Sequence, residues 1–252
     1  MTKPFAAEYP VTQAKDRIIV ALDVATAGEA REIIAELGNS VGAFKIGSQL
    51  FTSAGPSLVR ELTGAGHRIF LDLKFHDIPN TVANAAVEAA RLGVWMLNVH
   101  ALGGGEMMQH AARSVRTVCE REGLTRPLVI AVTVLTSSDE ATLREIGIDG
   151  TSEDEVVRLA KLAADSGLDG VVASPREARA IREVIPTAGF SIVTPGIRPL
   201  SATIDDQKRV TTIAAAFANG SSYVVIGRPI IEAADRRAAF GRFVEEAENI
   251  NK

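Results

Sequence analysis

The chain has 252 residues, enough for one large domain or two small ones. Apolar residues make up 46% of it and charged residues 23%, a composition that excludes intrinsic disorder. The net charge of −4 excludes a chain that is basic as a whole, so we expect no nucleic acid or anionic membrane as a partner. The single cysteine, Cys119, excludes an internal disulfide and a cysteine-cluster metal site, and it fits a reducing cytoplasm.

We expect no signal peptide and no membrane span in this sequence. The first sixteen residues contain no apolar run long enough for the core of a signal peptide. The longest later apolar run, residues 127–135, is far shorter than a membrane span. No linker or shift in composition divides the rest. We therefore expect a cytoplasmic protein with an N-terminal arm at residues 1–16 and a single domain at residues 17–252.

Eight short apolar runs, rich in β-branched residues, recur with roughly 29 residues between their starts. They are continuous rather than alternating, which is typical of strands covered on both faces. The predicted strands are residues 17–23, 43–47, 68–74, 95–100, 128–135, 170–174, 191–195 and 223–227. Helical spacing between them predicts helices at residues 27–37, 56–63, 81–92, 107–121, 152–165 and 175–184. This alternation predicts an α/β fold, a (β/α)8 TIM barrel, although periodicity alone leaves a doubly wound open sheet as the alternative.

The most informative segment is residues 70–81, FLDLKFHDIPNT, around the end of the third predicted strand. Residues i and i+2 of a strand share a face, so Asp72 and Lys74 are expected to point the same way. In a barrel that direction is the interior, near the C-terminal mouth where active sites form. A buried carboxylate and a buried ammonium need each other as partners. These two residues alone fit a structural ion pair as well as an active site.

Charged residues on two further strands favour the active site. Asp23 ends the first predicted strand, and Lys45 lies inside the second, where an inward lysine needs a carboxylate opposite. We expect Lys45, Asp72, Lys74 and Asp77 to form one array of alternating charge. Such an array is typical of groups with shifted pKa values.

The loops after the last two strands predict an anion site. They read TPGIRP at residues 194–199 and GRP at residues 227–229, a chemistry that leaves backbone N–H groups facing an anion. Barrels often bind phosphate at these two loops, and Arg228 offers a forked cation for phosphate oxygens. The plainer alternative is a helix start with a surface arginine. Thr136, near the end of the fifth strand, is expected to face the ligand.

These residues resemble the orotidine 5′-phosphate decarboxylase family. Residues 72–81 are similar to a family signature of the form D-x-K-x-x-D-I-P-x-T. Further similarity, in the same order as in the bacterial enzyme, lies at residues 20–23, 45–47, 98–100, 133–136, 194–199 and 225–229. The resemblance spans residue 17 to about residue 230.

The resemblance implies a homodimeric barrel that converts orotidine 5′-phosphate to uridine 5′-phosphate and carbon dioxide in UMP synthesis, without metal or organic cofactor. It implies that Lys74 donates the proton to C6, that Asp72 lies beside the departing carboxylate, and that Asp77 comes from the partner subunit. The other implied substrate contacts are Asp23 and Lys45 at the ribose, Thr81 across the dimer, Thr136 at the pyrimidine, Arg198 near the ligand, Gln207 between base and phosphate, and Gly227 with Arg228 at the phosphate.

Two other functions remain open at this point. A related sugar-phosphate decarboxylase or hexulose-phosphate synthase would share D-x-K-x-x-D but would hold a divalent metal with an acidic residue on the second strand. This chain has Lys45 there, which argues against a metal. A non-catalytic barrel that binds nucleotide phosphates would keep Gly227 and Arg228 but has no need of the charged array.

Overall fold

The computed structural model describes residues 13–187, 189–198 and 211–249. Its eight strands are parallel and follow chain order around a closed barrel, because β1 also pairs with β8. Closure confirms the predicted TIM barrel and rules out the open sheet. The strands are β1 (Ile18–Ala21), β2 (Ala43–Gly47), β3 (Ile69–Phe75), β4 (Met96–His100), β5 (Leu128–Val132), β6 (Gly170–Val172), β7 (Ser191–Thr194) and β8 (Tyr223–Ile226).

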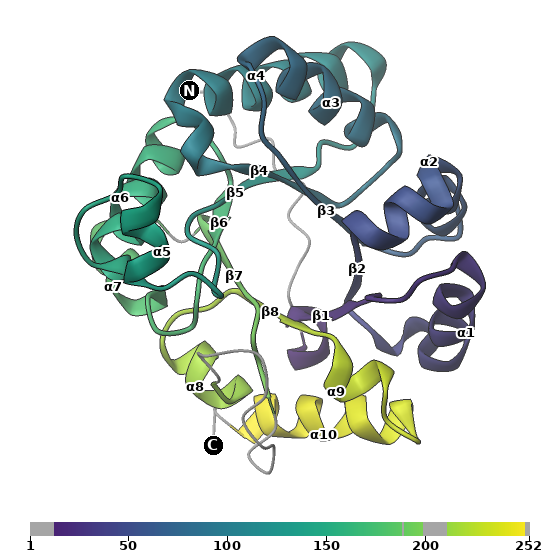
Figure 1. Ribbon diagram of the computed structural model, residues 1–252. Helices are drawn as coiled ribbons and strands as arrows, with labels where there is room; N and C mark the ends of the chain where they lie inside the picture. The colour runs from purple at the N-terminus through teal and green to yellow at the C-terminus, as the bar shows by residue number, and fades with distance from the viewer. Residues whose placement is uncertain (1–12, 188, 199–210, 250–252) are drawn as a thin grey trace.

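The helices lie outside the ring of strands (Figure 1). They are α1 (Ala27–Leu37), α2 (Ser48–Gly64), α3 (Pro79–Arg91), α4 (Gly104–Glu122), α5 (Glu140–Glu145), α6 (Ser152–Asp165), α7 (Ala178–Val184), α8 (Ile213–Ala218), α9 (Arg228–Ile231) and α10 (Arg236–Glu248). Three short 3-10 turns accompany them, η1 (Ala14–Arg17), η2 (Gly38–Ser40) and η3 (Ala101–Gly103). Within the described part of the chain, no helix is both long enough and apolar enough to span a bilayer.

The predicted strands and helices are all present, with ends that shift by a few residues. The prediction omits α5, α8 and α9, which have six residues or fewer, too few for a helical period to show. It also omits the first half of α2, because Gly55 (φ 67°) interrupts that helix with a kink. The prediction also omits α10, although the spacing of Phe240, Phe243 and Ala247, which are buried, is typical of a helix.

Alternation along each strand separates two layers of the core. On β1, Ile18 and Val20 pack outward against the helices, whereas Ile19 and Ala21 join a second cluster inside the barrel. That inner cluster includes Trp95, in edge contact with the ring of Tyr223, with ring centroids 5.2 Å apart. The same alternation places inward-facing side chains at successive levels, up to the C-terminal ends of the strands.

The segment before β1 packs against the barrel. The Arg17 side chain in η1 donates hydrogen bonds to the backbone carbonyls of Ser221 (2.7 Å) and Ser222 (3.0 Å), just before β8. Residues 1–12 of the predicted arm lie outside the described residues. The boundary between arm and barrel at residue 16 stays a prediction.

Candidate active site

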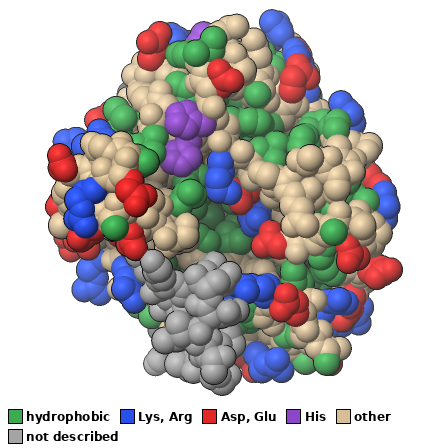
Figure 2. Space-filling view, viewed as in Figure 1, with side chains coloured by type: hydrophobic (Ala, Val, Ile, Leu, Met, Phe, Trp, Pro, Cys, Tyr) green, Lys and Arg blue, Asp and Glu red, His purple; other side chains and the backbone are tan. Residues whose placement is uncertain are grey.

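A cavity of about 420 Å³ opens among the C-terminal ends of the strands. This volume lies in the range of small-molecule sites. Figure 2 shows the hollow at the centre of this face, with basic and acidic side chains meeting in it. The predicted site residues among its lining are Asp23, Lys45, Asp72, Lys74, Thr136, Arg198, Gly227 and Arg228.

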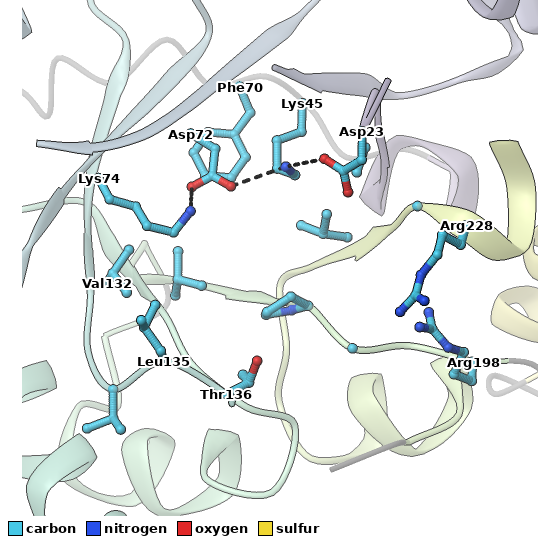
Figure 3. Close-up of a pocket in the computed structure, with 17 residues that line it drawn as sticks. Asp23, Lys45, Phe70, Asp72, Lys74, Val132, Leu135, Thr136, Arg198 and Arg228 are labelled. Atoms are coloured by element: carbon cyan, nitrogen blue, oxygen red, sulfur yellow. Dashed lines mark hydrogen bonds and ion pairs between the residues drawn. The ribbon is translucent and has the colours of Figure 1, made fainter. Parts of the chain in front are cut away.

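Four charged side chains form a row of alternating sign on one wall of this cavity (Figure 3). The Lys74 ammonium lies 2.7 Å from Oδ1 of Asp72, and the Lys45 ammonium lies 3.2 Å from Oδ2 of the same carboxylate. Lys45 also reaches Oδ1 of Asp23 at 3.1 Å. Because Phe70 faces inward in the inner cluster, Asp72, two residues further along β3, emerges above it at the mouth.

The middle of the row is buried. The side chains of Lys45 and Asp72 are only 11% and 12% exposed, whereas that of Asp23 is 54% exposed. Burial by itself lowers the pKa of Lys45, but the carboxylates of Asp72 and Asp23 outweigh it and raise that pKa above its ordinary value. Lys45 is therefore a fixed positive charge that keeps two carboxylates together.

Two arginines lie at the other end of the cavity from Lys74. Arg198 follows β7 and Arg228 follows β8, and their guanidinium groups face the same space in Figure 3. A Cβ on Gly227 would come within 3.2 Å of the Asp23 carboxylate and 3.4 Å of the Ala21 side chain, so a side chain there would crowd both. The cavity thus has a lysine–carboxylate end and an arginine end, as an elongated anionic ligand would require.

Comparison with known proteins assigns the chain to a family. Residues 16–243 match the family model described as orotidine 5′-phosphate decarboxylase / HUMPS family. The chain belongs to this family. Its relatives include orotidine 5′-phosphate decarboxylases from Syntrophotalea carbinolica, 52% identical over 236 residues (94% of this chain, 96% of the relative), and Moorella thermoacetica, 52% identical over 238 residues (94% of each). The crystal structure of orotidine 5′-phosphate decarboxylase from Lactobacillus acidophilus has a TM-score of 0.81 at 40% identity and covers 91% of this chain and 98% of that one.

The resemblance to the orotidine 5′-phosphate decarboxylase family is thereby confirmed, and with it the predicted enzyme class, a carboxy-lyase. The family model also covers the HUMPS branch, so family membership alone does not distinguish an orotidine 5′-phosphate decarboxylase from a member of that branch. The relatives at 52% identity are named as decarboxylases, and Lys45 stands in β2 where a metal site would need an acid.

Two predicted residues lie outside the cavity of their own chain. The Asp77 carboxylate accepts a hydrogen bond from the backbone N–H of Ile78 at 2.6 Å, and Asp77 is exposed. Thr81 is also exposed, in the first turn of α3. The array of Lys45, Asp72, Lys74 and Asp77 is therefore not complete within one chain, and Asp23 ends the observed row instead. Gln207 lies outside the described residues.

The remaining wall is apolar. Val132, Leu135 and Thr136, from the end of β5 and the loop after it, face the charged row across the cavity (Figure 3). Thr133 does not line the cavity, and its hydroxyl donates to the carbonyl of Val172 instead. An apolar wall with one hydroxyl suits an aromatic or heteroaromatic ring.

Sequence reasoning missed Asn98 as a site residue. Its side chain is completely buried on β4 and binds both Asp72 and the backbone of Lys74. The signal was present, because Asn98 is a polar residue near the end of an apolar strand, as Asp72 is on β3. The sequence does not show that the side chains of Asn98 and Asp72 contact each other.

Proposed function

We propose that this chain decarboxylates orotidine 5′-phosphate to uridine 5′-phosphate in pyrimidine biosynthesis, and that Lys74 protonates C6 of the pyrimidine. The observation that carries the proposal is the row Lys74, Asp72, Lys45 and Asp23 at one end of a cavity whose other end has two arginines. Family membership supports the decarboxylation, and the geometry supports the role of the lysine.

The chemistry needs a fixed cation at the reacting carbon. When the bond between C6 and the carboxylate breaks, both electrons stay on C6 in an sp² orbital that no neighbouring carbonyl can relieve. A preorganised ammonium stabilises this developing charge. Lys74 then gives a proton to C6, so that an N–H bond breaks, a C–H bond forms, and the neutral amine regains a proton from solvent. Its ion pair with Asp72 holds the ammonium in place beforehand.

Asp72 has a second role beside the substrate carboxylate. Two ammonium groups, 2.7 and 3.2 Å away, form ion pairs with its side chain. A substrate carboxylate bound next to it is repelled in the ground state, and the repulsion is relieved as carbon dioxide leaves. Binding energy from distant parts of the substrate offsets this unfavourable contact.

That distant binding is assigned to the arginine end. Arg228, the Gly227 amide and Arg198 bind the phosphate, while Thr136 contacts the pyrimidine. Asp23 and Lys45 hold the ribose hydroxyls, and Gln207 bridges base and phosphate. The placement of both arginines on the loops after β7 and β8, where barrels often bind phosphate, supports this orientation.

The active site is shared in a homodimer, with Asp77 and Thr81 entering the site of the partner. Ile78, between them, is 66% exposed, the most exposed large hydrophobic side chain among the described residues, and a partner subunit would cover it. Its backbone is extended (φ −58°, ψ 152°), the conformation that the following Pro79 favours. The protein functions in the cytoplasm, where its buried free thiol, Cys119, remains reduced.

The reaction needs no metal and no organic cofactor. The Lys45 ammonium lies 3.1 and 3.2 Å from two carboxylates and so occupies the place that a divalent cation between them would take. This observation opposes the alternative function, a metal-dependent sugar-phosphate enzyme.

The test is a decarboxylation assay with orotidine 5′-phosphate, before and after chelation with EDTA and dialysis. We expect full turnover in both samples. Activity that vanishes with EDTA and returns with magnesium would move the chain to the sugar-phosphate branch. Binding of the nucleotide without turnover would indicate the non-catalytic phosphate-binding barrel.

A further inference from the structure

Strand β3 is irregular where it carries the reactive residues. Leu71 pairs with Leu97 and Phe75 pairs with Val99, so three residues of β3 face a single residue of β4, Asn98. Such a bulge breaks the ladder of backbone hydrogen bonds and re-aims the side chains within it. The residues inside the bulge are Asp72, Leu73 and Lys74.

The bulge is strained at Lys74. Its φ is 52°, the only positive φ among the described residues other than glycine. The left-handed region is unfavourable for a residue with a Cβ and persists only when surrounding contacts hold it. Lys74 is also the residue whose ammonium is assigned to the reaction.

Asn98 supplies those contacts. Its side-chain Oδ1 accepts the backbone N–H of Lys74 at 2.8 Å, which replaces the ladder bond lost in the bulge. Its Nδ2 donates to Oδ1 of Asp72 at 2.7 Å, the same oxygen that binds the Lys74 ammonium. One buried amide thus fixes the backbone of the lysine and the carboxylate that aims its ammonium.

We propose that Asn98 is a positioning residue for the decarboxylation, holding Lys74 and Asp72 in their reactive geometry through its two side-chain hydrogen bonds. It acts through these residues rather than on the substrate, because it is completely buried and is not part of the cavity wall. The inference rests on the proposed function, since turnover of orotidine 5′-phosphate is what it changes.

The first variant is Asn98→Ala, which removes both bonds. We expect kcat to fall by about 10- to 100-fold, because small displacements of reacting groups cost rates of this order. KM should change by less than about threefold, since the arginine end of the cavity is untouched. A folded Asn98→Ala enzyme with wild-type kcat would overturn the proposal.

The second variant, Asn98→Asp, keeps the shape and the acceptor for the Lys74 N–H. Its second oxygen faces Asp72 and can take the place of the amide donor only when the new carboxyl is protonated. We therefore expect kcat, relative to wild type, to be nearest normal at about pH 5 and to fall towards about pH 9. The groups around the new carboxyl are Asp72 and Lys74 on β3, Lys45 on β2 beyond Asp72, His100 on β4, and the apolar Ile130 opposite on β5.

A matched control separates positioning from stability. Asp169, at the opposite end of the barrel, accepts hydrogen bonds from the Arg126 guanidinium and from the backbone N–H of Val129. Asp169→Asn should lower the melting temperature and leave the pH profile of kcat like that of wild type. If Asn98→Asp instead lowers kcat by one factor at every pH, or not at all, Asn98 has only a structural role. Absence of turnover in the wild-type enzyme would reject the proposed function itself.

Discussion

At the scale of single residues, the charged side chains of this site differ in the groups that balance their charge. Lys45 is buried, and its positive charge is tolerated because carboxylates lie on both sides at 3.1 and 3.2 Å. Arg198, by contrast, has one side-chain hydrogen bond among the described residues, from its guanidinium to the neighbouring Ile197 carbonyl at 3.4 Å, a long and weak contact. Lys45 is therefore held in place by two carboxylates of the protein, whereas the weakly bound Arg198 guanidinium is suited to binding a ligand.

The substitution Arg228→Ala tests the arginine end. If Arg228 binds phosphate, its loss should raise KM for orotidine 5′-phosphate by about 100-fold, as expected for a lost charge-assisted bidentate contact. Turnover of orotidine, which lacks the phosphate, should hardly change. Steady-state kinetics on both substrates provide the measurement, and equal losses on both would assign Arg228 a structural role.

His100 predicts a pH dependence of stability. Burial lowers its pKa below the ordinary 6.5, and the nearby His76 and Lys74 lower it further. Its Nδ1 is buried without a hydrogen-bond partner among the described residues, and its ring stacks on His76 with centroids 5.4 Å apart. The unfolded chain therefore takes up a proton at a higher pH than the folded protein does.

As the pH falls below 6.5 through the lowered pKa, this histidine should reduce the free energy of unfolding; above 6.5 it should have no such effect. His100→Gln should consequently lose less melting temperature than wild type between about pH 8 and about pH 5. Thermal melts across this range provide the measurement. The control is His110→Gln on α4, outside the barrel, and an identical acid loss in both variants would contradict the assignment.

At the scale of elements, β-strand alternation and helix ends place the site. Each strand presents alternate side chains to the barrel interior, and apolar residues fill the lower levels while charged residues occupy the mouth. The glycines that follow five of the helices have positive φ, a conformation that ends a helix at little cost for a residue without a Cβ. Those glycines are Gly38, Gly66, Gly93, Gly123 and Gly167.

The pairing of β6 with β7 depends on a small residue. A Cβ on Gly170 would lie 2.1 Å from the Ser191 carbonyl oxygen, so the two strands can approach only with glycine at this position. Gly170→Ala should lower the free energy of unfolding by about 1–3 kcal/mol, as overpacking does. Urea denaturation measures it from the midpoint. Gly189→Ala is the control, because an added Cβ there has no described atom within 4 Å beyond its own chain neighbours, and its effect should stay within about 0.5 kcal/mol.

At the scale of the whole molecule, one chain forms a closed barrel, but its cavity is lined by only some of the predicted site residues. Both lysines, Asp23 and Asp72 line the cavity, whereas Asp77 and Thr81 are exposed and do not line it. In the proposed homodimer, each chain would contribute Asp77 and Thr81 to the site of its partner. This exchange would give two equivalent sites per dimer.

Mixing two inactive homodimers tests this arrangement. In the proposed homodimer, Lys74→Ala or Asp77→Ala should remove activity from both sites. After subunit exchange, a mixed dimer would have one site with both lesions and one with neither. We expect recovery of up to about half of the wild-type activity per mixed dimer. Native mass spectrometry confirms exchange, and mixed dimers without activity would show that Asp77 serves its own chain.

The sequence by itself predicted the barrel, with an open sheet as the alternative, and it identified all the charged residues that line the cavity. Eight continuous apolar runs at regular spacing leave few alternatives, because parallel strands must be covered on both faces. Residues at strand ends, such as Asp72 and Lys74, could be assigned to one mouth because parallel strands end on the same side. Only the tertiary structure shows that Lys45 bridges Asp72 and Asp23 and that Asp77 does not line the cavity, because alternation along one strand does not specify contacts between strands. It alone revealed the bulge held by Asn98, because strand register depends on contacts between segments distant in the chain.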